Sequence, residues 1–192
     1  MTVTTTARLT SALLLGVLAG GCHAAQHPAA PASSAAPPTS TAQPAPPPPV
    51  NIQPLPVRPV QKSQPTTPNK CPATNPAAPT PPANVLVTCD LARTTLYTLG
   101  PESIQLGLTH VDPPKPLTSD FYEVNLTLNP ASATGWAAFT RDHLHDHIAF
   151  VRDDLVLEAP MIEQVVTFGQ IALTTQTPQA ADQLAQLAGR PA

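Results

Sequence analysis

The clearest fold signal in this chain is the stretch Phe121-Tyr122-Glu123-Val124-Asn125-Leu126-Thr127-Leu128-Asn129-Pro130. Apolar and polar residues alternate through residues 121–128, which is typical of a strand with one buried face. Asn129 can then cap a helix, and proline is tolerated at the first helical position. The stretch therefore predicts a strand followed directly by a helix that runs to about His145. The residues expected to point inward are Tyr122, Val124, Leu126 and Leu128 from the strand, then Trp136, Ala137, Thr140 and Leu144 from the helix.

The sequence on either side of this unit adds further strands and one more helix. Asp153-Asp154 separates two apolar runs, residues 147–152 and 155–158, and reads as a hairpin. A strand over 169–175 and a helix from Thr177-Pro178 to Gly189 follow. Upstream, residues 84–90 and 103–110 alternate as strands do. The order predicts an α+β domain: a small, mainly antiparallel sheet with two helices on one face.

Proline divides the chain into two compositional halves. Of its 27 prolines, 19 lie between Pro28 and Pro82, in a stretch rich in alanine, serine and threonine. Such a stretch cannot bury enough apolar surface to offset the entropy of ordering it. We therefore expect residues 22–82 to be a disordered tether and residues 83–192 to be the folded domain. A second interpretation is that Pro56-Val57-Arg58-Pro59, which has PxxP spacing, binds a proline-recognition module.

The N-terminus has the three parts of a secretory signal, which we assign to residues 1–21. Arg8 is its positive charge, residues 9–18 are its apolar run, and small residues precede Cys22. The order Leu18-Ala19-Gly20-Gly21-Cys22 resembles the bacterial lipobox, although its leucine lies one place further from the cysteine than usual. We expect Cys22 to be acylated, with palmitate among its chains, and to anchor the protein on the extracytoplasmic face of the cell membrane. The alternative is a cleaved signal with a chance cysteine.

Two further cysteines, Cys71 and Cys89, would meet an oxidising compartment in an exported protein. An even pair there favours a disulfide, with two unpaired thiols as the alternative.

From residue 121 onward the order of motifs resembles the head part of the large extracytoplasmic domain of SecD, a translocase subunit. The family has an aromatic-x-x-x-Thr helix, an aliphatic strand, an Asp-Gly turn, a Ser-Ala-Pro-x-Ile segment, a glycine-containing strand and an Ala-x-x-Leu-Ala helix. The corresponding residues here are Trp136–Thr140, Ile148–Val151, Asp153, Ala159–Ile162, Gly169 and Ala181–Ala185. The chain departs from this pattern at three places: Asp154 stands where the family has glycine, Glu158 replaces the serine, and Thr174-Thr175 lie where a glycine is common before the last helix. The resemblance implies the head fold and the handling of extended or newly exported chains.

The apolar segment after the hairpin is the candidate binding site. We expect a shallow groove or sheet edge that takes up an extended segment by strand addition; the alternative is that the two helices cover it completely. Its residues are Val156, Ala159, Pro160, Met161 and Ile162.

The sequence contains few residues or motifs that would indicate metal binding, catalysis or nucleic-acid binding. His143 and His147 could share a helix face, but no third metal ligand is evident, so we assign no metal and no cofactor. No nucleophile elbow, zinc-protease motif or phosphate-binding loop occurs, and we expect no catalysis. Residues 83–192 carry a net charge of −7, which argues against nucleic acid as a partner.

These observations predict a non-enzymatic, lipid-anchored cell-envelope protein whose domain binds polypeptides. The expected partners are exported polypeptides or the secretion machinery, and the expected role is accessory to protein export. One alternative is a surface carrier of a lipid or another small apolar ligand. Another is a structural spacer in the cell wall.

Overall fold

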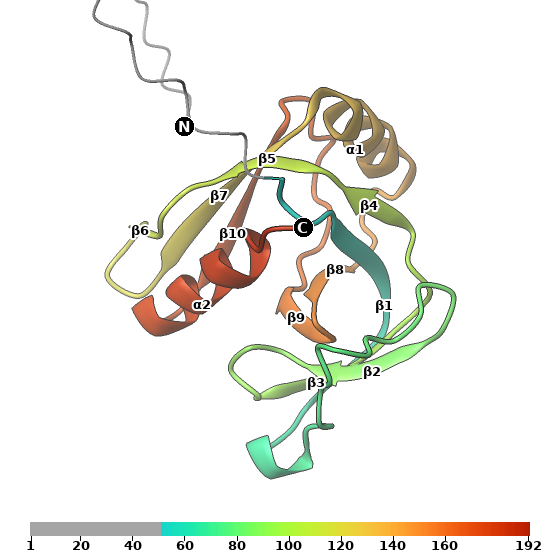
Figure 1. Cartoon of the computed structure of the whole chain (residues 1–192), viewed down its shortest axis with the longest axis vertical. Helices are drawn as coiled ribbons and strands as arrows, with labels where there is room; N and C mark the ends of the chain where they lie inside the picture. The colour runs from blue at the N-terminus through green and yellow to red at the C-terminus, as the bar shows by residue number, and fades with distance from the viewer. Residues whose placement is uncertain (1–50) are drawn as a thin grey trace, which may run out of the picture. The chain divides into compact units, whose positions relative to one another are not determined.

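The strand predicted from residues 121–128 is β7 (Tyr122–Leu128), the middle strand of a small antiparallel sheet in the computed structural model, which describes residues 51–192 (Figure 1). β10 (Gln170–Thr175) pairs with one edge of β7. β5 (Leu108–Val111) and the short β6 (Lys115–Pro116) pair with its other edge. Val124, Leu126 and Leu128 are buried, which confirms the predicted alternation.

Both helices begin where the sequence predicts. The Asn129 side chain accepts a hydrogen bond from the Ser132 N–H at the start of α1 (Pro130–Asp142). The Thr177 hydroxyl does the same for the Ala180 N–H at the start of α2 (Pro178–Ala188). α1 ends at Asp142, which is earlier than expected, and His145, in the left-handed conformation, lies within the turn that follows. The inward position predicted for Leu144 is wrong, since 39% of its surface is exposed.

Gly107 separates β5 from β4 (Ile104–Leu106), so the strand predicted over residues 103–110 is two strands. Its N–H donates to the Ser132 hydroxyl at 2.8 Å, and its carbonyl accepts from the Asn129 N–H at 2.9 Å. A Cβ at this position would lie 2.2 Å from Asn129 Nδ2. Only glycine therefore lets the chain approach the start of α1 this closely.

The remaining strands form a second, larger sheet, so the strands lie in two sheets where one was expected. Its order is β2-β3-β1-β8-β9, and β4 also pairs with β1. Both helices contact β7; α1 also contacts β4, and α2 also contacts β10. The domain is α+β, as predicted. The bounds of the remaining strands are β1 (Leu55–Pro65), β2 (Leu86–Cys89), β3 (Thr95–Leu99), β8 (Ile148–Arg152) and β9 (Leu155–Glu158).

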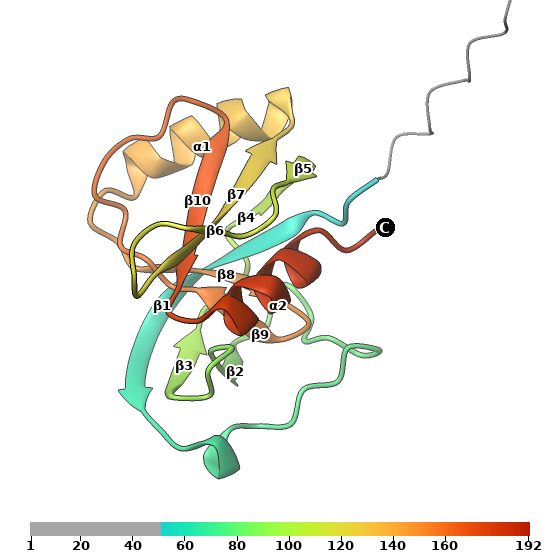
Figure 2. The same cartoon turned by 90° about the vertical axis from the view of Figure 1, so that its left-hand side faces the viewer.

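β1 corrects the predicted boundary between tether and domain. It lies at the centre of the larger sheet and pairs with β3, β4 and β8 along its length (Figure 2). Leu55 and Val57 are completely buried in the main core. The expectation of an open tether is therefore wrong for residues 51–82. The predicted signal segment, Cys22 and tether residues 22–50 lie outside the described residues.

The two edges of the larger sheet approach each other. Asp90, directly after β2, forms a parallel bridge with Val156 in β9. The curled sheet encloses a small second core, separate from the main core between the helices and β7. The buried residues of this second core are Leu86, Leu99, Ala149, Val151 and Val156. Within residues 51–192, no helix is long and apolar enough to cross a bilayer.

Residues 66–85 connect β1 to β2 and are fastened to the sheet at three places. A disulfide joins Cys71 to Cys89 at the end of β2. The Thr80 N–H and hydroxyl both donate to the Asp154 carboxylate, each at 2.9 Å. The Arg58 side chain in β1 donates to the Asn84 carbonyl at 2.7 Å. These attachments explain how a proline-rich segment without strands of its own is ordered.

We expect the Cys71→Ser/Cys89→Ser variant to lose about 3 kcal/mol of unfolding free energy. The bond closes a loop with a sequence separation of 18, and loops of that size restrict the unfolded chain by about this amount. Urea unfolding of the Cys22→Ser chain, expressed without residues 1–21, with and without the two substitutions would measure the loss. Reductant should lower the midpoint of the parent and leave the variant unchanged; equal midpoints for all samples would contradict the prediction.

Candidate functional site

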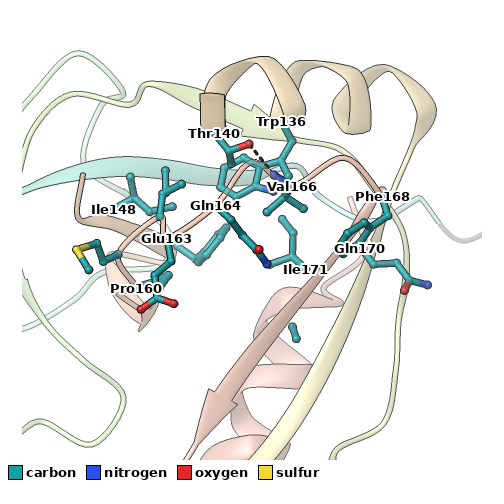
Figure 3. A pocket seen from close by; sticks show the side chains of 14 residues that line it. Trp136, Thr140, Ile148, Pro160, Glu163, Gln164, Val166, Phe168, Gln170 and Ile171 are labelled. Carbon is teal, nitrogen blue, oxygen red and sulfur yellow. Dashed lines mark hydrogen bonds between the residues drawn. The ribbon is translucent and has the colours of Figure 1, made fainter. Parts of the chain in front are cut away.

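An apolar cavity of about 220 Å³ opens between α1, β8, β10 and the loop that joins β9 to β10 (Figure 3). We call it the head cavity. Each element contributes side chains to its wall. They are Trp136 and Thr140 from α1, Ile148 and Phe150 from β8, residues 160–164, Val166 and Phe168 from the loop, and residues 170–172 from β10.

The cavity has a rigid aromatic floor and an exposed apolar rim. Trp136 and Phe150 are almost completely buried, with ring centroids 5.8 Å apart, and Trp136 also stacks on Phe139 at 5.5 Å. On the rim, 41% of the Met161 surface and 66% of the Phe168 surface are exposed. Large apolar side chains exposed together beside a cavity indicate an interaction site more strongly than scattered ones do.

The segment Pro160–Ile162 is held in place by backbone hydrogen bonds to the start of β8. The Ile148 N–H donates to the Pro160 carbonyl at 3.0 Å, and the Ile162 N–H donates to the Asp146 carbonyl at 3.0 Å. The His145 N–H in turn donates to the Ile162 carbonyl at 2.8 Å. The backbone of this segment therefore forms a fixed wall of the cavity, while the Met161 side chain is exposed on the rim.

The structure brings only part of the predicted groove together. Pro160, Met161 and Ile162 line the head cavity. Val156 and Ala159 do not: Val156 is completely buried in the second core, and Ala159 packs against that core. This follows from strand alternation, because β9 directs Val156 into the curled sheet and Leu157 toward the main core.

Three aromatic residues are among the contributors to the cavity that were not expected from the sequence as site residues: Trp136, Phe150 and Phe168. Trp136 was predicted to face the sheet, which is where its ring lies. Phe150 belongs to a predicted strand in which all five residues are buried, so alternation gave no sign of its direction. Phe168 lies in a loop, where no periodic pattern indicates the position of a side chain.

The edge of β10 beside the cavity carries unpaired backbone groups at Ala172, whereas the outward N–H of Gln170 donates to the Phe168 carbonyl. The Thr174 N–H donates to the Glu158 carboxylate at 3.1 Å, so it points away from β7. In an antiparallel strand, the backbone N–H and carbonyl of successive residues point alternately toward and away from the partner strand. Ala172, two residues before Thr174, therefore also points its N–H and carbonyl away from β7. The residue opposite Ala172 in β7 supports this orientation. It is Asn125, whose carbonyl accepts a hydrogen bond from the Asp112 N–H on the other edge of β7 and so points away from β10. Ala172 lines the cavity and is exposed, and within residues 51–192 its donor and its acceptor have no partner, so both can pair with another strand.

Thr140 fixes the loop over α1. Its hydroxyl oxygen accepts a hydrogen bond from the Val166 N–H at 3.0 Å (Figure 3) and donates to the Ala137 carbonyl at 3.4 Å. The side chain is completely buried. The threonine of the aromatic-x-x-x-Thr motif therefore connects the helix to the cavity wall.

Glu158 links the two sheets below the cavity. Its carboxylate accepts hydrogen bonds from the Thr174 N–H and from the Thr174 hydroxyl, the latter at 2.7 Å. Burial raises the pKa of Glu158 above the ordinary value, and the two hydrogen bonds from Thr174 oppose the rise. The cost of removing the charge from water is therefore the larger effect.

We expect the Glu158→Gln variant to be more stable than the parent at pH 7.5, with a difference that shrinks toward pH 4. A raised folded pKa means that the folded state holds the Glu158 proton more tightly than the unfolded state. The parent therefore keeps this stabilisation below the unfolded pKa and loses it as the pH rises through the folded pKa. Glutamine stays neutral and can both accept from the Thr174 N–H and donate to its hydroxyl. Urea unfolding of both proteins from pH 4 to 8 would test this; a parent that is more stable than the variant at pH 7.5 would contradict it.

The histidines near the end of α1 do not form a metal site. The His143 ring lies 2.9 Å from the Asp146 carboxylate, and Phe139 packs on the same ring. His147 lies beyond the helix, where its backbone forms an isolated antiparallel β-bridge with Met161. In the part of the chain that the structure describes, residues 51–192, no three histidine, cysteine or acidic side chains are arranged to hold a metal ion.

Comparison with known proteins identifies the part of the chain that contains the cavity. Residues 111–189 match the family described as the SecDF P1 head subdomain. This segment is therefore related to the head of SecDF, which confirms the resemblance drawn from the sequence. All residues that line the head cavity lie within it.

The chain also resembles solved structures of SecDF. One is a membrane component SecDF that enhances protein export, with 20% identity over 72% of this chain and 62% of that chain, and a TM-score of 0.47. Another is SecDF in a super-membrane-facing form, with 20% identity over 72% of this chain and 19% of that chain, and a TM-score of 0.45. The chain thus spans less than two thirds of either. No curated protein matches it in sequence.

Proposed function

We propose that this domain binds extended segments of exported polypeptides at the head cavity, without catalysing a reaction. The observation that carries the proposal is the free edge of β10 at Ala172, which lies directly beside an apolar cavity with an exposed rim. The relation to the SecDF head supports a role accessory to protein export.

Binding would follow from strand addition. The backbone of an extended segment pairs with the Ala172 N–H and carbonyl, and the next side chain along the segment enters the cavity. A cavity of about 150 Å³ in another protein holds benzene, so about 220 Å³ suits a single leucine- or phenylalanine-sized side chain. Such a contact requires one apolar residue in the bound segment but no particular amino-acid sequence around it.

The size of the cavity also favours a polypeptide over a carried lipid. Sites that enclose small organic ligands usually measure about 300–1,000 Å³. The head cavity is smaller, and its rim is open. Native mass spectrometry of the protein from its own host would reveal a retained lipid if the domain were a carrier.

Photo-crosslinking in intact cells tests the proposal. A benzoylphenylalanine at Met161 should capture exported polypeptides, which mass spectrometry would identify. The matched control is the same amino acid at Leu117, which is 55% exposed but lies outside the cavity. Equal capture at the two positions, or none at Met161, would contradict binding at this site.

A backbone substitution makes the test specific for strand addition. Ala172→Pro removes the outward N–H but no hydrogen bond to β7, and proline is tolerated on an edge strand in this orientation. We expect it to abolish most of the Met161 adducts. Met161→Asp, with the crosslinker at Phe168, is a second variant should Ala172→Pro fail to fold. Undiminished adducts in a folded variant would rule out the proposed mode.

We further propose that Cys22 carries the lipid that holds the domain at the membrane. Its support is the sequence around Cys22, which lies outside the described residues. Replacing Cys22 by serine should move the protein from the membrane to the soluble fraction and remove incorporation of labelled palmitate. Membrane retention by the serine variant would contradict lipid anchoring.

A further inference from the structure

The indole N–H of Trp136 is a buried donor without an acceptor. Trp136 lines the head cavity, and only 3% of its surface is exposed. Among the described residues, none accepts a hydrogen bond from its Nε1. The neighbouring Thr140 hydroxyl already accepts from Val166 and donates to Ala137.

An unpaired donor of this kind disfavours the empty state of the cavity. A buried N–H without a partner costs about 1–3 kcal/mol, because it has left water and gained nothing in exchange. A pure hydrocarbon in the cavity leaves this cost unchanged. A ligand that carries an oxygen acceptor beside its apolar group removes it.

We infer that Trp136 is a specificity-determining residue that donates its indole N–H to a main-chain carbonyl of the bound polypeptide. This rests on the proposed function and adds a chemical requirement to it: an apolar side chain must enter together with a carbonyl acceptor. Every residue of an extended peptide offers that combination.

The geometry fixes the donor and leaves the entrance adjustable. Phe139 and Phe150 pack on the indole and hold its orientation. The nitrogen is shielded from water in the free protein, so a neighbouring side chain must move before a bound segment can reach it. Met161 and Phe168 are exposed and can move without breaking the core.

Because Trp136 is the only tryptophan of the chain, its indole proton gives a single resonance in a ¹H–¹⁵N spectrum. The protein is the Cys22→Ser chain expressed without residues 1–21. The two probes are N-acetylphenylalanine methylamide and propylbenzene, which share an aromatic ring but differ in the presence of carbonyl groups. Both should shift the methyl resonances of Ile148 and Ile162. Only the amide should move the indole proton downfield.

Affinity gives a second readout. Trp136→Phe keeps an aromatic ring and removes the N–H. It should weaken amide binding about 3- to 10-fold, the range expected for one hydrogen bond, and change propylbenzene binding less than twofold. If this variant does not fold, the indole resonance of the parent carries the test alone.

The outcomes separate this inference from the function on which it rests. If both probes shift the cavity methyl groups and neither moves the indole proton, binding stands and the role of Trp136 is overturned. If the amide does not shift the cavity methyl groups, the proposed polypeptide site is overturned as well. If methyl laurate moves the indole proton and binds more tightly than the amide, the carbonyl belongs to a lipid ester, and the polypeptide assignment is overturned.

Discussion

A fragment that begins at Asn84 will not unfold cooperatively, whereas a fragment that begins at Asn51 will. The difference is β1, which pairs with β3, β4 and β8 and so joins three parts of the larger sheet. Its Leu55 and Val57 are completely buried, and burial of each contributes about 1.5–3 kcal/mol. The loss of these side chains and of three strand pairings is comparable with the whole stability of a typical domain, about 5–15 kcal/mol.

Urea unfolding followed by the fluorescence of Trp136 would measure this. The 51–192 fragment should give a sigmoidal transition, and the 84–192 fragment a gradual change without baselines. Val57→Asp in the longer fragment is the control for the loss of β1 packing without truncation, and it should also abolish the transition. A cooperative transition of the same steepness in both fragments would show that β1 is dispensable.

The second large effect is expected at Arg58: its replacement by methionine should lower the free energy of unfolding by about 3–5 kcal/mol. The guanidinium is 1% exposed and donates to the Asn84 and Gly100 carbonyls at 2.7 and 3.1 Å. It also donates to the Pro81 carbonyl and to the Glu102 carboxylate, each at 3.3 Å. Methionine fills the space of the side-chain stem but leaves these oxygens, one of them charged, without their donor.

Three comparisons make the measurement specific. Arg58→Lys should recover part of the loss, because a single ammonium cannot reach all four acceptors. Adding Glu102→Gln to Arg58→Met should recover part of it as well, because it removes the unpaired charge. Arg141→Met, at an exposed arginine, should change stability by less than about 0.5 kcal/mol. A loss at Arg58 no greater than at Arg141 would mean that the four contacts contribute nothing.

The elements after residue 120 could be predicted because their signals are local. Alternation marks β7, and side-chain caps mark the starts of α1 and α2. The Asp153-Asp154 turn could be predicted too, and both of its residues adopt the left-handed conformation that such a turn requires. Each of these patterns depends on residues within a few positions of one another.

β1 could not be predicted because its stability comes from distant partners. Pro56, Pro59 and Pro65 lie within it, and proline argues against a central strand because it has no N–H to donate. The structure uses Pro59 as an acceptor, since its carbonyl accepts from the Gly100 N–H, and the next residue supplies a donor, since the Val60 N–H donates to the His147 carbonyl. A prediction from composition alone therefore placed β1, an ordered strand, within the disordered tether.

The head cavity was predictable only where its residues form a local sequence pattern. The apolar run Pro160–Ile162 could be identified along the sequence as a candidate wall. The free edge at Ala172 and the unpaired Trp136 N–H depend on which groups the fold leaves without partners, and no local pattern reports that.

If the chain is exported unfolded, as the sequence around Cys22 predicts, the central position of β1 has a consequence for the order of folding events. Val57 pairs with Phe150, so β1 of an exported chain would leave the channel early and would wait for a partner about ninety residues behind it. Contacts between residues so far apart in the sequence form slowly. The larger sheet would therefore stay unfolded, and able to pass through a channel, until most of the domain had been translocated. An exported protein with this topology would delay its own folding until passage through the channel is nearly complete.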